Sequence, residues 1–167
     1  MNSSQAMVVV LMGVSGSGKT RIGVMLARAL GWEFHDGDEL HSAANRNKMH
    51  RGIPLTDSDR LPWLRRIRRL IDKCLAREIS AVIACSALKR SYRDIIIGDS
   101  NRVRSVYLKG SRKLIAGRLS RRTGHFMSPD LLASQFDTLE EPRDGITVDV
   151  SGTPAEIVRK IRKRLRV

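Results

Sequence analysis

One glycine-rich segment restricts the possible folds of this chain more than any other feature of its sequence. Residues 13–20 fit the pattern G-x-x-x-x-G-K-[ST] at every position. A continuous apolar run, 7–12, precedes the segment, and apolar residues at helical spacing follow it as far as Gly31. This order predicts a strand buried in a parallel sheet, then a tight turn, then an amphipathic helix.

The same segment predicts a binding site for a nucleoside triphosphate. Glycines let the backbone approach an anion closely, so its N–H groups and the N-terminus of the next helix can point at phosphate oxygens. Lys19 is expected to reach the β- and γ-phosphates, and the hydroxyl of Thr20 is expected to bind Mg²⁺. The alternative is a glycine-rich turn with an accidental lysine, which the flanking pattern disfavours. The expected nucleotide-binding residues are Gly13, Val14, Ser15, Gly16, Ser17, Gly18, Lys19 and Thr20.

The remaining pattern predicts an α/β fold in which strands alternate with helices. Such alternation favours a mostly parallel sheet, here of five strands, with helices on both faces. No repeat, low-complexity tract or linker interrupts the 167 residues, which predicts a single domain over residues 1–167. We expect strands at 7–12, 33–35, 80–85, 103–108 and 148–150. We expect helices at 22–30, 38–49, from Thr56 or Asp57 to 75, 88–97, 112–121, 129–136 and 154–167.

Composition narrows the class of protein further. The chain has 31 Lys+Arg against 17 Asp+Glu, and this charge of +14 suggests a polyanionic partner. Aromatic residues make up only 4%, which argues against base-stacking recognition of nucleic acid. No apolar run is long enough to span a bilayer, and no secretory leader is expected. Cys74 and Cys85 lack metal-binding spacing, so we expect two buried thiols in a reducing cytoplasm.

Two carboxylates follow the second expected strand and indicate a kinase. No guanine-binding N-K-x-D signature is present, and the chain is too short for a helicase. On extended backbone, Asp36 and Asp38 would face the same side. One could hold the water shell of Mg²⁺, a role expected for Asp36, while Asp38 accepts a proton from an attacking hydroxyl. Alternatively, Asp38 caps a helix that begins at Glu39, and both roles could hold together.

The sequence resembles the gluconate kinases, which belong to the P-loop small-molecule kinases together with shikimate kinase and adenylate kinase. The resemblance extends from about residue 8 to 142, and its blocks occur in the family's order. It is carried by residues 11–20 (LMGVSGSGKT), 35–38 (HDGD) with 40–41 (LH), 51–57 (RGIPLTD), 59–60 (DR) with 62–64 (PWL), 85–90 (CSALKR) with 92–94 (YRD), 107–110 (YLKG), 124–127 (GHFM), and 135–136 (QF) through 139–140 (LE).

This resemblance implies a reaction, a fold and partners. The reaction would be ATP-dependent phosphorylation of the 6-hydroxyl of D-gluconate to 6-phosphogluconate, with Mg²⁺ as cofactor. The fold would be a three-layer αβα P-loop kinase with a mobile helical lid. The acceptor-binding region would cover about 38–62, and the lid about 118–136. Members of the family are commonly dimers, so a homodimer is expected.

A polyhydroxy acid needs cations for its carboxylate and short polar groups for its hydroxyls. Arg51, Lys89 and Arg90 follow element ends where loops would converge, and they are the expected cations. Ser86, His41 and Asp38 are expected to exchange hydrogen bonds with hydroxyls. The alternative readings are solvated bases on the surface and a structural histidine.

Arginines in the expected lid complete the predicted catalytic set. Arg118 and Arg122 match the family pattern, while Arg121 falls where the family is looser. They precede residues 123–127, a segment with a glycine and poor helical patterning. By resemblance they would close over the nucleotide and neutralise charge on the transferring phosphoryl group. An ordinary basic helix end is the alternative.

Two other functions remain as alternatives at this point. A kinase for another hydroxy acid, such as shikimate, would share the phosphate loop and the carboxylates. A nucleic-acid-binding ATPase would explain the charge, but no nucleic-acid-binding module is recognisable, so no specific nucleic acid is expected. Ten of the 31 Lys and Arg residues lie on what should be the outer faces of the helices at 64–71 and 154–167. We therefore expect a solvated basic surface there, with weak attraction for polyanions as a side effect.

Overall fold

A five-stranded sheet organises the chain, whose computed structural model describes residues 5–122 and 128–167. All strand pairs are parallel, in the order β2-β3-β1-β4-β5, which confirms the predicted fold class. The strands are β1 (Val8–Met12), β2 (Glu33–Asp36), β3 (Ala81–Ala84), β4 (Val103–Lys109) and β5 (Ile146–Asp149). The helices are α1 (Lys19–Leu30), the 3₁₀ helix η1 (Gly37–Leu40), α2 (Ala43–His50), α3 (Asp57–Ala76), α4 (Arg90–Ile97), α5 (Arg112–Ser120), α6 (Pro129–Thr138) and α7 (Pro154–Leu165).

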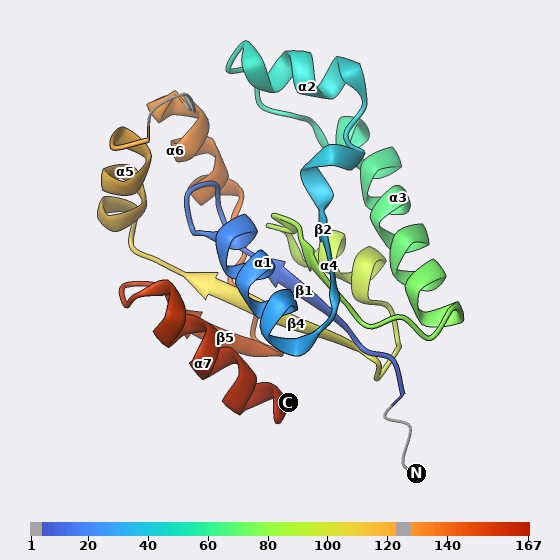
Figure 1. Ribbon diagram of the computed structural model, residues 1–167. Coiled ribbons are helices and arrows are strands. Elements are labelled where there is room, and N and C mark those ends of the chain that lie inside the picture. The colour runs from blue at the N-terminus through green and yellow to red at the C-terminus, as the bar shows by residue number, and fades with distance from the viewer. Residues whose placement is uncertain (1–4, 123–127) are drawn as a thin grey trace.

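Alternating side chains of β1 divide the core into two layers. Val8, Val10 and Met12 pack with residues of α3 and α4 on one face of the sheet. Val9 and Leu11 pack with residues of α1 and α7 on the other face. Burial on both faces explains why this strand is apolar throughout. Figure 1 shows the resulting three layers, with α1 and α7 on the side of the sheet opposite α4.

Three expected element boundaries are wrong. The helix expected at 38–49 is two elements, because His41 is extended and the Ser42 side chain accepts from the Asn45 N–H to start α2. The helix expected from residue 88 begins at Arg90, because Ala87 has a φ of 44° and Lys89 is extended. The last strand covers Ile146–Asp149 rather than 148–150.

The expectation of a wholly solvated basic surface is also wrong in part. Arg65 and Arg69 of α3 are exposed, and so are most bases of α7. By contrast, Arg66 donates to the Leu40 carbonyl at 3.1 Å, and Arg68 donates to the Ile97 carbonyl at 2.8 Å. Two of the four arginines between residues 65 and 69 therefore connect α3 to neighbouring helices instead of only meeting solvent. Cys74 and Cys85 are buried free thiols, as expected.

The topology brings the predicted functional residues to one edge of the sheet. Parallel strands β1, β2 and β3 end there, followed by the phosphate loop, the Asp36–Asp38 segment and Ser86. In Figure 1, α2 and the pair α5–α6 stand on opposite sides of the loop that joins β1 to α1. None of the helices in the described part of the chain combines the length and apolar character that crossing a membrane requires.

Candidate active site

The phosphate loop begins where β1 ends and turns directly into α1. Gly16 has a φ of 81°, and a Cβ there would lie 2.8 Å from Leu119 Cγ, so both conformation and space require glycine. Gly18, with a φ of 97°, is the N-cap of α1, which puts the helix N-terminus at the loop. Lys19 Nζ donates to the carbonyls of Gly13 and Val14, each at 3.0 Å. The Lys19 side chain therefore lies against the loop in which it is expected to bind phosphates.

Asp36 joins the phosphate loop to the segment that follows β2. One carboxylate oxygen accepts from the Thr20 hydroxyl at 3.0 Å, and the other accepts from the Asp38 backbone N–H at 3.0 Å. The two residues of the predicted magnesium site are thus in contact. The extended backbone expected between the carboxylates is wrong, because Asp38 lies in η1. The alternative cap is wrong as well, since Asp36 is the residue that caps η1.

Close packing fixes the turn between the two carboxylates. A Cβ on Gly37 would lie 2.5 Å from the Ala84 carbonyl oxygen and 2.8 Å from Ile67 Cδ1. The Gly37 carbonyl also accepts from Trp63 Nε1 at 2.7 Å, within the core. Neighbouring β3 and α3 therefore hold the turn on two sides, which fixes the backbone that carries Asp38.

Electrostatics couple three of the predicted catalytic groups. Burial lowers the pKa of Lys19, and the negative charge of Asp38 is the largest influence that raises it again. The positive charge of Arg122 lowers the same pKa further. Lys19, Asp38 and Arg122 therefore act on one another across the end of the sheet, although they come from α1, η1 and the segment after α5.

His41 has a structural position rather than an open one. Its ring stacks on Trp63 with centroids 4.1 Å apart, and the residue is only 6% exposed. Burial and the charges of Arg60, Arg46 and Arg66 lower its pKa to about 4, so the ring is neutral near pH 7. Within residues 5–122 and 128–167, its Nδ1 has no hydrogen-bond partner. This placement favours the structural reading of His41.

Lys89 belongs to a polar network between the first turns of α3 and α4. Its Nζ donates to both carboxylate oxygens of Asp57, at 3.0 and 3.1 Å, and this hydrogen bond raises the pKa of Lys89. The Tyr92 hydroxyl donates to the same carboxylate, and Arg60 donates to that hydroxyl at 3.1 Å. Neither Arg60 nor Tyr92 was predicted to take part, although both belong to the blocks that carry the family resemblance.

The remaining expected acceptor residues lie around the rim. Arg51 ends α2 and is exposed, and its neighbour Gly52 would place a Cβ 3.5 Å from Ser128 Oγ, beside α6. Ser86 is half-buried, and its carbonyl accepts from the Gly13 N–H at 3.3 Å. Arg90 is exposed, and its backbone N–H donates to Glu140 at 2.8 Å.

The lid side contacts the phosphate loop through residues that were not all anticipated. Arg118 donates to the carbonyl of Val150, the residue after β5, so its guanidinium already has a backbone partner. Arg122 is exposed. Gln135 of α6 accepts from the Ser15 N–H at 2.7 Å, and its amide lies 3.4 Å from the Ser15 hydroxyl. The expected glycine-containing segment 123–127 lies outside the described residues.

Comparisons with known proteins decide between the kinase classes. A family model described as shikimate kinase matches residues 15–166. The chain is 43% identical to a probable gluconokinase of Mus musculus, over 95% of this chain and 97% of that protein. It is 44% identical to the thermosensitive gluconokinase of Escherichia coli (strain K12), over 92% of this chain and 84% of that protein. The chain belongs to the gluconokinase family of shikimate kinase-like P-loop kinases.

Structural similarity supports the same family. A crystal structure of a gluconokinase from Sinorhizobium meliloti 1021 has a TM-score of 0.82 and 44% identity, over 96% of this chain and 95% of that one. An unliganded sugar kinase from Janibacter sp. HTCC2649 has a TM-score of 0.90 and 43% identity, over 97% and 95%. Membership of the gluconokinase family confirms the P-loop kinase fold and an ATP-dependent kinase class.

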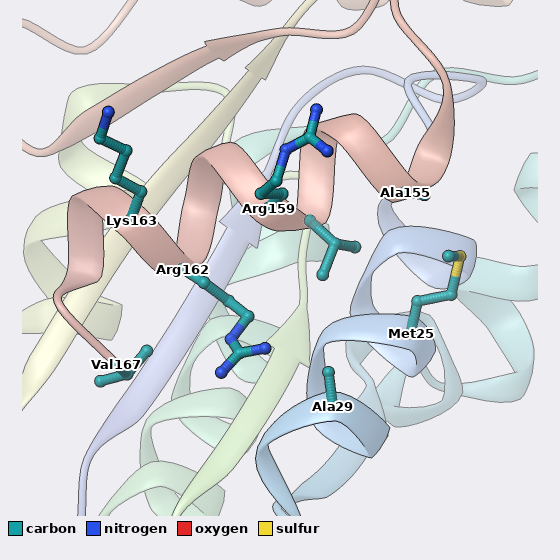
Figure 2. A pocket seen from close by; sticks show the side chains of 8 residues that line it. Met25, Ala29, Ala155, Arg159, Arg162, Lys163 and Val167 are labelled. Carbon is teal, nitrogen blue, oxygen red and sulfur yellow. The ribbon is translucent and has the colours of Figure 1, made fainter.

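A separate groove of this gluconokinase-family chain lies away from the phosphate loop. It has a volume of about 550 Å³, and Figure 2 shows it between the α1 residues Met25 and Ala29 and the basic side chains of α7. None of the predicted site residues lines it. Its lining residues are Met25, Ala29, Ala155, Val158, Arg159, Arg162, Lys163 and Val167.

Proposed function

We propose that this chain transfers the γ-phosphoryl group of ATP to the 6-hydroxyl of D-gluconate, yielding 6-phosphogluconate and ADP. The observation that carries the proposal is the double hydrogen bond of Asp36. Asp36 accepts from the Thr20 hydroxyl on the nucleotide side and from the Asp38 backbone N–H on the acceptor side, so one carboxylate connects the two sides. Relatives named gluconokinase, 43–44% identical over nearly the whole chain, supply the substrate class.

Different residues bind the phosphates, accept the proton and neutralise charge during the transfer. The loop N–H groups and Lys19 bind the β- and γ-phosphates. When the nucleotide binds, Lys19 Nζ leaves the Gly13 and Val14 carbonyls and donates to phosphate oxygens instead. Asp38 accepts the proton of the attacking hydroxyl. A bond then forms between that oxygen and the γ-phosphorus, while the bond from γ-phosphorus to the β-phosphate oxygen breaks. Arg122, already close enough to influence Lys19, neutralises charge on the phosphoryl oxygens.

Oxygen donors from the end of β2 and the first turn of α1 suit a magnesium ion. Mg²⁺ prefers oxygen ligands and usually keeps several of its waters. The Thr20 hydroxyl and the Asp36 carboxylate are both oxygen donors, 3.0 Å apart, so we propose that they hold the ion directly or through its waters. When bound, Mg²⁺ would offset negative charge on the phosphates.

Arg51 and Arg90 are our preferred partners for the carboxylate of gluconate. Asp57 already neutralises Lys89, which leaves that lysine less available for a second anion. No side-chain hydrogen bond of Arg51 or Arg90 occurs among residues 5–122 and 128–167, and both residues are exposed. Ser86, in the loop after β3, is the proposed hydroxyl partner. Lys89 would take part only by exchanging Asp57 for the substrate.

An acceptor panel tests the proposed reaction. ADP release is measured with ATP and Mg²⁺ in the presence of gluconate, shikimate, other sugar acids, or no acid. Turnover should be highest with gluconate, and the product should be 6-phosphogluconate. Turnover that is no higher with gluconate than without any acid would contradict the proposal. Strong stimulation by an oligonucleotide, lost at high salt, would instead support a nucleic-acid-dependent ATPase.

We also infer a homodimer and a cytoplasmic location. The free thiols of Cys74 and Cys85 suit a reducing compartment. The dimer rests on the family resemblance, and light scattering of the purified chain should give twice the monomer mass of 18.7 kDa. A mass of one chain across micromolar concentrations would contradict it.

A further inference from the structure

Three metal-binding side chains meet on the face of the sheet that α3 covers, outside the proposed active site. Glu33 and His35 lie two residues apart on β2, so both project toward the same face. Cys74 approaches them from the last turns of α3. One carboxylate oxygen, one imidazole nitrogen and the thiol sulfur all lie within 4.8 Å of one another. We call these three residues the β2–α3 cluster.

We propose that the β2–α3 cluster binds a zinc ion. Thiolate, imidazole and carboxylate are all ligands of Zn²⁺, whereas Mg²⁺ takes oxygen ligands and binds thiolates poorly. Tetrahedral zinc has ligand distances near 2.0–2.3 Å, which separates ligand atoms by roughly 3.5 Å. His35 Nε2 and Glu33 Oε2 are already 3.0 Å apart in a hydrogen bond, so only small side-chain shifts would admit the ion.

The surrounding space also fits an ion with three protein ligands. The cluster lines a pocket of about 80 Å³, together with Leu70, Lys73, Arg77 and Ile79. A water molecule takes up about 30 Å³, so the pocket has room for an ion and a water as fourth ligand. Glu33 is exposed, His35 is half-buried and Cys74 is buried, so the three ligands extend from the surface into the protein.

Charge is balanced when the site is loaded. Burial raises the pKa of the Cys74 thiol and Glu33 raises it further, while Lys73 and Arg77 oppose them. Zinc binding forms the S–Zn bond and breaks the S–H bond, releasing that proton to solvent without any redox step. The thiolate and the carboxylate then supply two negative charges for Zn²⁺. A neutral centre is compatible with both the partial burial and the two nearby cations.

Zinc binding would be tested on the whole protein, reduced, stripped of metal and kept in excess Mg²⁺. Competition with a chromophoric chelator should give one zinc per chain. Cys74→Ala and His35→Ala should each weaken binding by at least about tenfold, since even outer-shell changes at zinc sites cost 10–100-fold. Cys85→Ala and His50→Ala are matched controls that remove a thiol and an imidazole elsewhere, and they should leave the affinity unchanged.

Cobalt supplies a second signature, and a further variant excludes the magnesium site. Co²⁺ bound to the wild type should give a thiolate-to-cobalt absorption band that Cys74→Ala abolishes and Cys85→Ala retains. Asp36→Asn should leave zinc binding intact. The proposal is overturned if the Cys74 and His35 variants bind zinc as the wild type does, or if Asp36→Asn is the variant that loses it. Melting curves recorded in chelator identify any variant that does not fold. If Cys74→Ala or His35→Ala is unfolded, Glu33→Gln, which changes an exposed ligand, is tested in its place and should also weaken zinc binding.

Discussion

The two sides of the phosphate loop are held in different ways. On one side, the acceptor corner, defined as residues 36–41, is hydrogen-bonded to α1 through Thr20 and to α3 through Trp63. On the other side, the lid helices α5 and α6 reach the loop through Leu119, which packs against Gly16, and Gln135, which binds Ser15. Among the described residues, the corner is anchored in the core by the buried Trp63–Gly37 hydrogen bond, whereas α6 meets the loop through a partly buried hydrogen bond.

This difference matches the different demands of the two sides. A proton acceptor must keep its position relative to the reacting atoms, and a displacement of about 1 Å can cost 10²-fold in rate. A lid must let nucleotide in and product out, so its contacts should break at low cost. We therefore expect changes in the acceptor corner to affect catalysis and stability strongly. Changes at the lid contacts made by Leu119 and Gln135 should have small effects, unlike loss of the phosphoryl-binding Arg122.

The largest expected effect comes from Asp38→Asn. Loss of the proton acceptor should lower kcat by about 10²–10⁴-fold, because positioned general bases contribute on that scale. The KM for ATP should change little, since Asp38 lies on the acceptor side. Steady-state kinetics with gluconate and ATP varied separately would measure both.

Lys19→Ala is the contrasting variant for that experiment. It removes a phosphate ligand, so kcat and ATP affinity should both fall. If Asp38→Asn lost ATP affinity to the same extent as Lys19→Ala, the acceptor-side role of Asp38 would be wrong.

A pair of glycine substitutions tests the packing contrast directly. A Cβ at Gly37 would meet the Ala84 carbonyl oxygen at 2.5 Å, so Gly37→Ala should lower the free energy of unfolding by about 1–3 kcal/mol. Gly117, within α5 on the lid side, has no atom within 4 Å of such a Cβ. Gly117→Ala should therefore raise the free energy of unfolding by about 0.5–1 kcal/mol, through helix propensity alone. Urea denaturation measures both, and equal shifts of the same sign would remove the contrast.

The buried histidine gives the acceptor corner a pH dependence. The pKa of His41 falls from 6.5 to about 4 on folding, so between these values the unfolded chain binds more protons. The free energy of unfolding should consequently fall as pH drops from 6.5 toward 4, and this contribution should level off below 4. His41→Phe keeps a ring against Trp63 without titrating, which should flatten the slope in urea denaturation across this window.

The matched control is His50→Ala, because His50 is exposed at the end of α2. This variant should keep the wild-type slope. An unchanged slope in His41→Phe would mean that the folded protein protonates His41 near the usual pH.

Local sequence signals account for the parts of the molecule that were predicted, and long-range contacts account for the rest. The strands and the phosphate loop follow from contiguous patterns, so residues 7–20 were read correctly in order. The shape of the acceptor corner depends on Trp63 binding Gly37, 26 residues away, and no local pattern shows that. Arg66 and Arg68 looked like solvated bases, because nothing in a helical pattern reveals a carbonyl on a neighbouring element.

The contact of Gln135 on the lid side could not be predicted from local sequence either, because its partner Ser15 is 120 residues away. Gln135→Ala should raise the KM for ATP by about 2–10-fold, the size expected for one net hydrogen bond of about 0.5–1.5 kcal/mol. The reason is that α6 would no longer hold the loop in its binding shape. We expect kcat to stay within about twofold of the wild type, because the acceptor corner is untouched and one lid contact is cheap to lose.

Gln135→Glu refines this smallest effect. The carboxylate can still accept from the Ser15 N–H, yet it adds a negative charge beside the ATP phosphates, so its KM for ATP should exceed that of Gln135→Ala. Ser134→Ala, one residue earlier in α6, should behave as the wild type. A large loss of kcat in Gln135→Ala with normal KM would show that the lid side also fixes the reacting atoms, and the proposed division between a rigid corner and a replaceable lid would then fail.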